Sequence, residues 1–178
     1  NVAVSNVGMN SAVVSWTSDA SAWNLRYRKS GEEQWTTKKG VSQSTGYTVD
    51  NLTDGSRYEV QVQAVKDDKV SDWTSSVNFT TLMDLPYSYS FENNDLLADG
   101  WILQGATSAN TGIRQGYGRT GSYDFKFDYS EEKAYLLSPT FKSGANDVAV
   151  SFWYRAYNSK YPELFQVGYT TTANETDA

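Results

Sequence analysis

Apolar side chains alternate with polar ones along several short segments of the chain. In residues 57–65, Tyr58, Val60, Val62 and Ala64 occupy every second position, with glutamate and glutamine residues between them. Successive side chains of a β-strand point to opposite faces, so this spacing predicts a strand with one buried and one hydrated face. The same alternation predicts further strands at residues 12–16, 23–28, 35–37, 47–49 and 77–80. About seven short strands without helical periodicity in roughly 80 residues predict a β-sandwich.

Three segments of this first part carry a family resemblance. They are Val13-Val14-Ser15-Trp16, residues 23–27 and Leu52-Thr53-Asp54-Gly55-Ser56-Arg57-Tyr58. As a set they resemble a fibronectin type III domain over residues 1–82, which implies an immunoglobulin-like sandwich. Tyr58 lies six residues after Leu52, where that family places a tyrosine whose hydroxyl hydrogen-bonds to upstream backbone. Asp54 stands where the family usually has proline.

No residue of the first domain indicates a particular ligand, and its fold alone does not imply a function. No Arg-Gly-Asp triplet is present, so the sequence does not support an integrin-binding function. Trp73 is expected to stack on strand arginines such as Arg26 or Arg28 in a cation–π contact, which is a structural role. We therefore expect residues 1–82 to act as a spacer or packing partner.

Residues 83–178 continue the alternating pattern, with longer loops between the expected strands. Aromatic residues alternate with charged ones over residues 123–129, and similar alternation predicts strands at residues 148–155 and 164–169. The segment Met83-Asp84-Leu85-Pro86 is the natural junction between the two parts. We therefore predict two all-β domains, at residues 1–82 and 83–178.

Short motifs in the second domain follow a characteristic order, namely Phe91-Glu92, Gly100-Trp101, Thr120-Gly121-Ser122-Tyr123, Leu136-Leu137-Ser138-Pro139 and Ser151-Phe152-Trp153-Tyr154. This order resembles the first part of a MAM-type, concanavalin-like jelly-roll β-sandwich and the cleaved-adhesin domains of secreted bacterial proteins. The bacterial version is favoured because this chain has no cysteine, whereas animal MAM domains typically carry cysteines. The resemblance implies further strands after residues 163–165. Since soluble proteins avoid open sheet edges, we expect that the sequence is partial or that another chain segment supplies those strands.

The composition excludes several classes of function. The chain has no cysteine and no histidine, which excludes disulfides, Cys/His zinc sites and nucleophiles activated by histidine. A net charge of −6 without a Lys/Arg cluster argues against nucleic acid. No run approaches the roughly 18 apolar residues of a membrane span.

A pair of carboxylates is the catalytic route that remains open to such a chain. Asp124 and Asp128 share a face by their spacing, and Glu131-Glu132 follow them. The same aspartates are the polar half of an amphipathic strand, which explains them without catalysis. We therefore expect that the chain is not an enzyme.

Calcium is a candidate ligand of the second domain. Glu92, Asp95 and Asp99 concentrate oxygen ligands of the kind that Ca²⁺ prefers, although their spacing does not match an EF-hand loop. The resembling families sometimes bind calcium near the Phe-Glu motif. The alternative is a polar turn, with Asp99 in a tight bend before Gly100.

Carbohydrate is a second candidate ligand. Sugars stack their apolar faces on Tyr or Trp while Asn, Asp and Arg bind the hydroxyl groups. Two loops have this chemistry, at residues 114–119 and 157–161, and their candidate ligand-binding residues are Tyr117, Arg119, Tyr157, Asn158 and Tyr161. Ordinary surface tyrosines and generic contacts with a protein partner are the alternatives.

Together these features predict a non-catalytic binding or adhesion module, secreted or at the cell surface, which recognises a glycan or a protein. One alternative is an accessory region of a larger secreted hydrolase, a glycosidase or protease, whose catalytic domain lies outside this chain. A spacer at the cell surface is a third reading.

Overall fold

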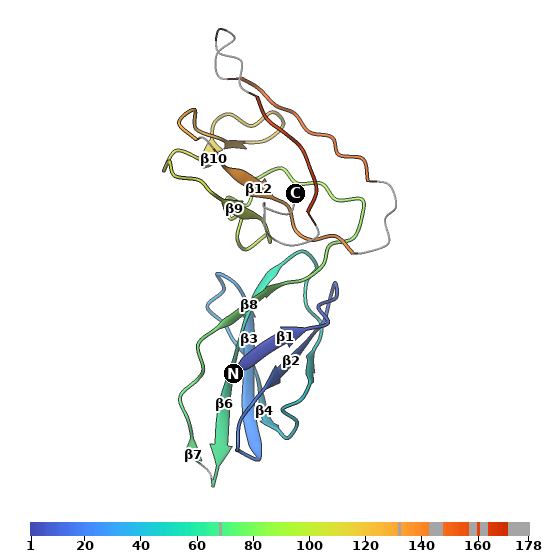
Figure 1. Cartoon of the computed structure of the whole chain (residues 1–178), viewed down its shortest axis with the longest axis vertical. Helices are drawn as coiled ribbons and strands as arrows, with labels where there is room; N and C mark the ends of the chain where they lie inside the picture. Colours follow the sequence, from blue (N-terminus) through green and yellow to red (C-terminus); the bar gives the residue numbers. More distant parts are fainter. Residues whose placement is uncertain (68, 132, 143–147, 157–159, 161–163, 171–178) are drawn as a thin grey trace. The chain divides into compact units, whose positions relative to one another are not determined.

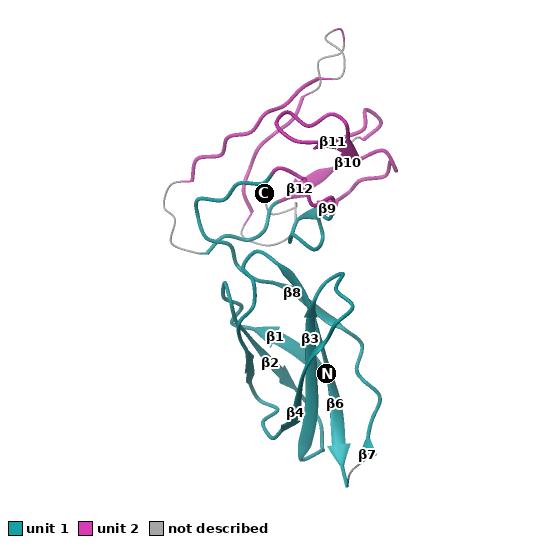
Figure 2. Ribbon diagram, turned by 180° about the vertical axis from the view of Figure 1, so that it is seen from behind, with its two compact units in different colours: residues 1–89, 95–102, 138–142 teal, residues 90–94, 103–137, 143–178 magenta. Residues whose placement is uncertain are grey.

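Figure 1 shows the computed structural model, which describes residues 1–67, 69–131, 133–142, 148–156, 160 and 164–170. The described residues form strands and no helix, so the all-β prediction is confirmed. The chain divides into two compact units, coloured separately in Figure 2. Unit 1 contains residues 1–89, 95–102 and 138–142, and unit 2 contains residues 90–94, 103–137 and 143–178. The predicted division into domains after residue 82 stays a prediction.

Most of unit 1 is a sandwich of two antiparallel sheets. One sheet has the order β1 (Val2–Ser5), β2 (Ala12–Trp16) and β5 (Tyr47–Val49). The other has the order β4 (Thr36–Val41), β3 (Ala22–Lys29), β6 (Arg57–Lys66) and β7 (Lys69–Val70), and β8 (Val77–Thr80) also pairs with β6. The strands predicted from alternation at residues 12–16, 47–49 and 77–80 have the observed bounds. The short strands β1 and β7 were not predicted.

The core of the sandwich is built from the alternate residues of these strands. In β3, Trp23, Leu25 and Tyr27 are buried, while the residues between them are partly exposed. They pack in one cluster with residues of the opposite sheet, including Val14 and Val49. Burying one such aliphatic side chain contributes roughly 1.5–3 kcal/mol, so a cluster of this kind carries much of the stability.

Tyr58 occupies the position that the family resemblance implied. Its hydroxyl oxygen accepts a hydrogen bond of 2.8 Å from the backbone N–H of Thr53, which confirms the predicted contact with upstream backbone. The ring is buried and stacks on Phe79 with centroids 5.7 Å apart. Gly55 follows Asp54 with a φ of 54°, a conformation that glycine adopts without the Cβ strain of other residues. The corner therefore forms without the usual proline.

Arginines and tryptophans stack alternately on the outer face of the larger sheet. The Arg26 guanidinium lies 4.3 Å from the ring centroid of Trp73, which confirms the predicted cation–π contact. Trp35, which was not predicted, lies between Arg26 at 4.4 Å and Arg28 at 4.3 Å. Burial, with a smaller effect of the Arg28 charge, lowers the pKa of Arg26. The resulting Trp73–Arg26–Trp35–Arg28 stack is a structural feature of the sheet.

Unit 1 also holds an aromatic group outside the sandwich strands. The rings of Tyr87, Tyr89 and Trp101 lie within contact distance of one another, and Phe141 packs edge-on against Tyr87. Trp101 Nε1 donates a hydrogen bond of 2.9 Å to the Tyr87 hydroxyl. Burial raises the pKa of both tyrosines, and a hydrogen bond of 2.7 Å to Asp99 raises that of Tyr89 further. Trp101 of the Gly-Trp motif thus serves packing.

Two short strand pairs make up the regular structure around unit 2 among the described residues. Strand β10 (Gly112–Gln115) pairs with β11 (Tyr123–Lys126), and β12 (Tyr135–Leu137) pairs with β9 (Ile102–Gln104). The strand predicted over residues 123–129 is therefore shorter than expected.

The strands predicted at residues 148–155 and 164–169 are absent, since the described residues there carry no strand assignment. Alternation selects which side chains share a face, but a strand also needs a neighbour for its backbone, which the pattern does not specify. Phe152, Tyr154 and Phe165 contact one another with centroids 5.0–6.5 Å apart, yet each remains exposed. That further strands cover this apolar face stays a prediction.

Candidate ligand-binding surface

The hairpin of β10 and β11 positions the first part of the candidate surface. Its register sets Arg114 opposite Asp124. Arg114 Nε donates to Asp124 Oδ1 over 2.8 Å and Nη2 to Oδ2 over 2.6 Å. A two-pronged contact of this kind holds the guanidinium in one orientation. The loop after β10 closes through the N–H of Gly116, which donates to the carbonyl of Ser122 over 2.7 Å.

Tyr117 lies in this loop close to two arginines. The Arg114 guanidinium is 4.0 Å from the centroid of its ring, and that of Arg155 is 5.5 Å away. Arg155 Nη2 also lies 3.8 Å from Asp124 Oδ2, so both arginines approach the same carboxylate. Tyr117 nevertheless remains 51% exposed, so much of its side chain is open to a ligand.

Arg119 extends the surface to Trp153. Its guanidinium carbon is 3.5 Å from the centroid of the Trp153 ring, which is 76% exposed. Trp153 and Arg155 are two residues apart, and both contact the loop that follows β10. We call Arg114, Tyr117, Arg119, Asp124, Trp153 and Arg155 the arginine–aromatic surface. It combines three arginines and one aspartate with two exposed aromatic rings.

The structure places two of the five predicted ligand-binding residues in this surface, namely Tyr117 and Arg119. Tyr157, Asn158 and Tyr161 lie outside the described residues. Arg114 belongs to the loop of residues 114–119 that the sequence selected for sugar chemistry, whereas Asp124, Trp153 and Arg155 were missed as ligand-binding residues. A signal for two of them was present, because Trp153 and Arg155 occupy the alternate positions opposite Phe152 and Tyr154.

The carboxylates proposed for calcium have protein partners. Glu92 accepts hydrogen bonds of 3.0 and 2.9 Å from the backbone N–H groups of Ser122 and Tyr123. Asp95 accepts a hydrogen bond of 2.9 Å from the N–H of Ala98, and Asp99 accepts one from the Tyr89 hydroxyl. Within the part of the chain that the structure describes, no three Asp or Glu residues group together as metal ligands. This geometry favours the polar-turn alternative, and the calcium site stays a prediction.

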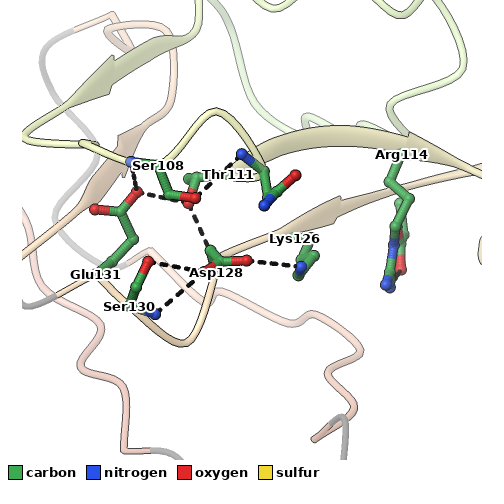
Figure 3. A network of polar contacts seen from close by, with 9 residues as sticks. Ser108, Thr111, Arg114, Lys126, Asp128, Ser130 and Glu131 are labelled. Carbon is green, nitrogen blue, oxygen red and sulfur yellow. Dashed lines mark hydrogen bonds and ion pairs between the residues drawn. The ribbon is translucent and has the colours of Figure 1, made fainter.

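Glu131 organises a polar network in unit 2 (Figure 3). Its carboxylate accepts hydrogen bonds from the backbone N–H groups of Thr107 and Ser108 and from the hydroxyls of Thr107 and Thr111. The Thr107 N–H, with the Thr111 hydroxyl and the Ser108 N–H, lowers the pKa of Glu131 to about 2. A carboxyl group with this pKa stays ionised at neutral pH and does not serve as a general acid.

Asp128 joins the same network through Thr111, whose hydroxyl oxygen accepts the Asp128 N–H over 3.0 Å (Figure 3). The buried Asp128 carboxylate accepts hydrogen bonds from Lys126 Nζ over 2.9 Å and from the Ser130 hydroxyl over 2.8 Å. Lys126 and Ser130 lower the pKa of Asp128. These contacts explain Asp128 and Glu131 structurally, while Glu132 lies outside the described residues.

The network predicts acid sensitivity. The Glu131 pKa of about 2 lies below its ordinary value of 4.5, so the unfolded chain binds more protons between these values. The stability contributed by Glu131 is therefore fully present above pH 4.5 and is lost as the pH falls toward 2. The carboxyl ¹³C shift of Glu131, followed by NMR through acid titration, measures the pKa, and denaturation across the same window measures the stability.

Glu131→Gln is the matched variant for this titration, and Glu33→Gln, an exposed change in unit 1, is its control. We expect Glu131→Gln to flatten the dependence of stability on pH between 4.5 and 2, and Glu33→Gln to leave it nearly unchanged. Equal slopes in the native chain and Glu131→Gln would show that the network does not hold this carboxylate ionised.

Comparison with known families accounts for the first half of the chain. Residues 1–80 match the family model described as the fibronectin type III domain. Residues 1–80 form a fibronectin type III domain. This module is often used in binding or adhesion. The match does not extend to residues 81–178.

Several solved structures are similar to a little under half of the chain. One, described as a myokine structure, is 28% identical, with 46% of this chain and 92% of that chain covered and a TM-score of 0.41. A computationally redesigned β-sandwich protein is 26% identical, with 46% and 89% covered and a TM-score of 0.40. The type III domain of human fibronectin type III domain containing protein 3 is 19% identical, with 45% and 80% covered and a TM-score of 0.39. Comparison with curated proteins found no match.

Proposed function

We propose that this chain is a non-catalytic binding module, secreted or at the cell surface, and that its arginine–aromatic surface recognises a glycan. The observation that carries the proposal is the exposure of Trp153 and Tyr117 beside arginine guanidinium groups. Exposed aromatic rings offer flat apolar faces to sugars, and the adjacent polar groups can hydrogen-bond sugar hydroxyls.

The contacts within the surface support a binding role because they orient its polar groups before a ligand arrives. The two-pronged bond to Asp124 holds Arg114, and Arg114 in turn covers part of Tyr117. A surface that is already ordered loses less conformational entropy on binding, which favours affinity. An exposed cation–π contact contributes only about 0.5–1 kcal/mol, so folding stability alone is a weak reason for this arrangement.

The fibronectin type III domain is assigned a supporting role in this proposal. Its arginine–tryptophan stack and the hydrogen bond from Thr53 to the Tyr58 hydroxyl stabilise the sandwich itself. No helix in the described part of the chain is long and apolar enough to span a membrane. An adhesion module and an accessory region of a secreted hydrolase would both use a surface of this chemistry.

The architecture of the remaining residues is part of the same proposal. We place residues 83–178 in a MAM-like, cleaved-adhesin-type jelly roll. The order of the motifs supports this placement, as do the antiparallel pair β10–β11 and the strand pair β9–β12. In this proposal the arginine–aromatic surface belongs to the second domain.

A glycan array probed with the full chain tests the proposed function. We expect selective binding, and we expect Trp153→Ala to weaken it about tenfold or more, as loss of an aromatic anchor does. Tyr129→Ala removes another exposed aromatic side chain of unit 2, outside the surface, and is the matched control. Absence of binding to any glycan, or equal losses in both variants, would contradict the proposal, and binding of a protein ligand alone would replace the glycan by a protein partner.

A further inference from the structure

The arginines of the arginine–aromatic surface are not equally neutralised. Arg114 is bound at two points by Asp124, whereas Arg155 reaches the same carboxylate with one nitrogen at 3.8 Å. Arg119 has no ion pair with any carboxylate among the described residues, and its recorded contact is the ring of Trp153. The surface itself has three arginines and one aspartate, and Glu92, which accepts hydrogen bonds from the backbone N–H groups of Ser122 and Tyr123, reduces the local excess of positive charge to one.

This excess contrasts with the charge of the whole chain, which is −6. At physiological ionic strength, charges farther away than about 8 Å are largely screened. A small ligand on this surface therefore responds to the nearby arginines more than to the acidic remainder of the protein. Recognition of an uncharged sugar would not require this excess of arginine.

The stacking of Arg119 leaves its hydrogen-bond donors available. The Trp153 ring covers one face of the guanidinium, while the N–H groups of a guanidinium point outward in its own plane. An in-plane pair of N–H donors matches the two oxygens of a carboxylate or sulfate group. Exposed Arg155, 62% accessible at its side chain, adds a second donor group beside Tyr117.

We propose that the arginine–aromatic surface binds an acidic saccharide, through contact of Arg119 and Arg155 with a carboxylate or sulfate group. Trp153 and Tyr117 pack against the sugar rings that carry it. This inference rests on the proposed function and narrows its ligand to one chemical class.

Calorimetry with the full chain and matched oligosaccharides tests this inference. The probes are an oligogalacturonate, its fully methyl-esterified form, a sulfated oligogalactan and the unsulfated oligogalactan. We expect binding to at least one acidic member, with affinity at least tenfold lower for its uncharged counterpart. The carboxylate and sulfate pairs distinguish the two sources of negative charge. Binding is expected to weaken as salt concentration rises.

Variants of Arg119 connect the binding to this surface. Arg119→Gln should weaken binding of the acidic saccharide about 10- to 100-fold, the usual effect of losing a charged hydrogen-bond partner. Arg119→Lys should restore part of the affinity, because lysine keeps the charge but lacks the planar pair of donors. Lys133→Gln removes an exposed charge of unit 2 outside the surface and is the control. Because Arg119 is exposed, unchanged thermal unfolding should accompany its substitution.

Each outcome distinguishes this inference from the proposed function. Equal affinity for the charged and uncharged members of each pair would overturn the acidic-saccharide inference and leave glycan binding standing. Equal losses in Arg119→Gln and Lys133→Gln would show nonspecific attraction and overturn it as well. Absence of binding to all four probes would overturn it too, and the glycan array would then decide the proposed function separately.

Discussion

Leu25→Ala is expected to lower the free energy of unfolding of the fibronectin type III domain by about 2–5 kcal/mol. Leu25 is 0% exposed and lies in the middle of β3, which pairs with both β4 and β6. Removing its side chain leaves a cavity between the sheets, because neighbouring strands cannot close it without breaking their register. Urea denaturation of the full chain, followed by tryptophan fluorescence, measures the loss.

Val70→Ala is the control for this substitution. Val70 lies in β7 of the same domain and is 57% exposed, so its truncation should change stability by no more than about 0.5 kcal/mol. Similar losses in Leu25→Ala and Val70→Ala would contradict the central position of Leu25 in the core.

Trp35→Ala is expected to destabilise the same domain by about 1–3 kcal/mol, since it removes cation–π contacts with two arginines and the partly buried area of the indole. Trp35 lies between Arg26 and Arg28 at 4.4 and 4.3 Å. Both arginines are also anchored across the sheet, Arg26 to Gln61 and Arg28 to Glu59. They would therefore stay in place after the substitution, with one face newly exposed to water.

Trp73→Ala separates the effect of stacking from that of losing any tryptophan. Trp73 contacts one arginine where Trp35 contacts two, so its removal should cost less. A double-mutant cycle of Trp35→Ala with Arg28→Ala should show a coupling of about 0.5–1 kcal/mol. Zero coupling would show that the contact between Trp35 and Arg28 does not stabilise the domain.

The sequence predicted the fibronectin type III domain well because local signals agreed with one another there. Alternation in residues 57–65 and 23–28 located β6 and β3, and the spacing of Leu52 and Tyr58 located the corner. The position of Trp73 near strand arginines predicted one contact of the stack. Trp35 was missed because its contact with both arginines depends on the register of β4 against β3.

The second part of the chain was harder to predict for the same physical reason. Alternation over residues 148–155 separated Phe152 and Tyr154 from Trp153 and Arg155, but it did not specify a neighbouring strand. The candidate surface combines residues from β10, β11, the loop between them and residues 148–156. Tyr117 and Arg119 were predicted as ligand-binding residues from the residue types of their loop. Asp124 and Arg155 could be assigned to the surface only from their distances to the other residues in the folded chain.

The sequence by itself determined the all-β class, the buried faces of most strands in the first domain and the residue types available for binding. These properties follow from the two-residue period of a strand and from side-chain chemistry, both of which are local. Only the tertiary structure decided which arginine stacks on which ring, which carboxylates accept hydrogen bonds from backbone N–H groups, and which arginine of the arginine–aromatic surface lacks a carboxylate partner among the described residues. Those properties depend on pairing between segments far apart in the chain, and the alternation of residues within a strand does not specify that pairing.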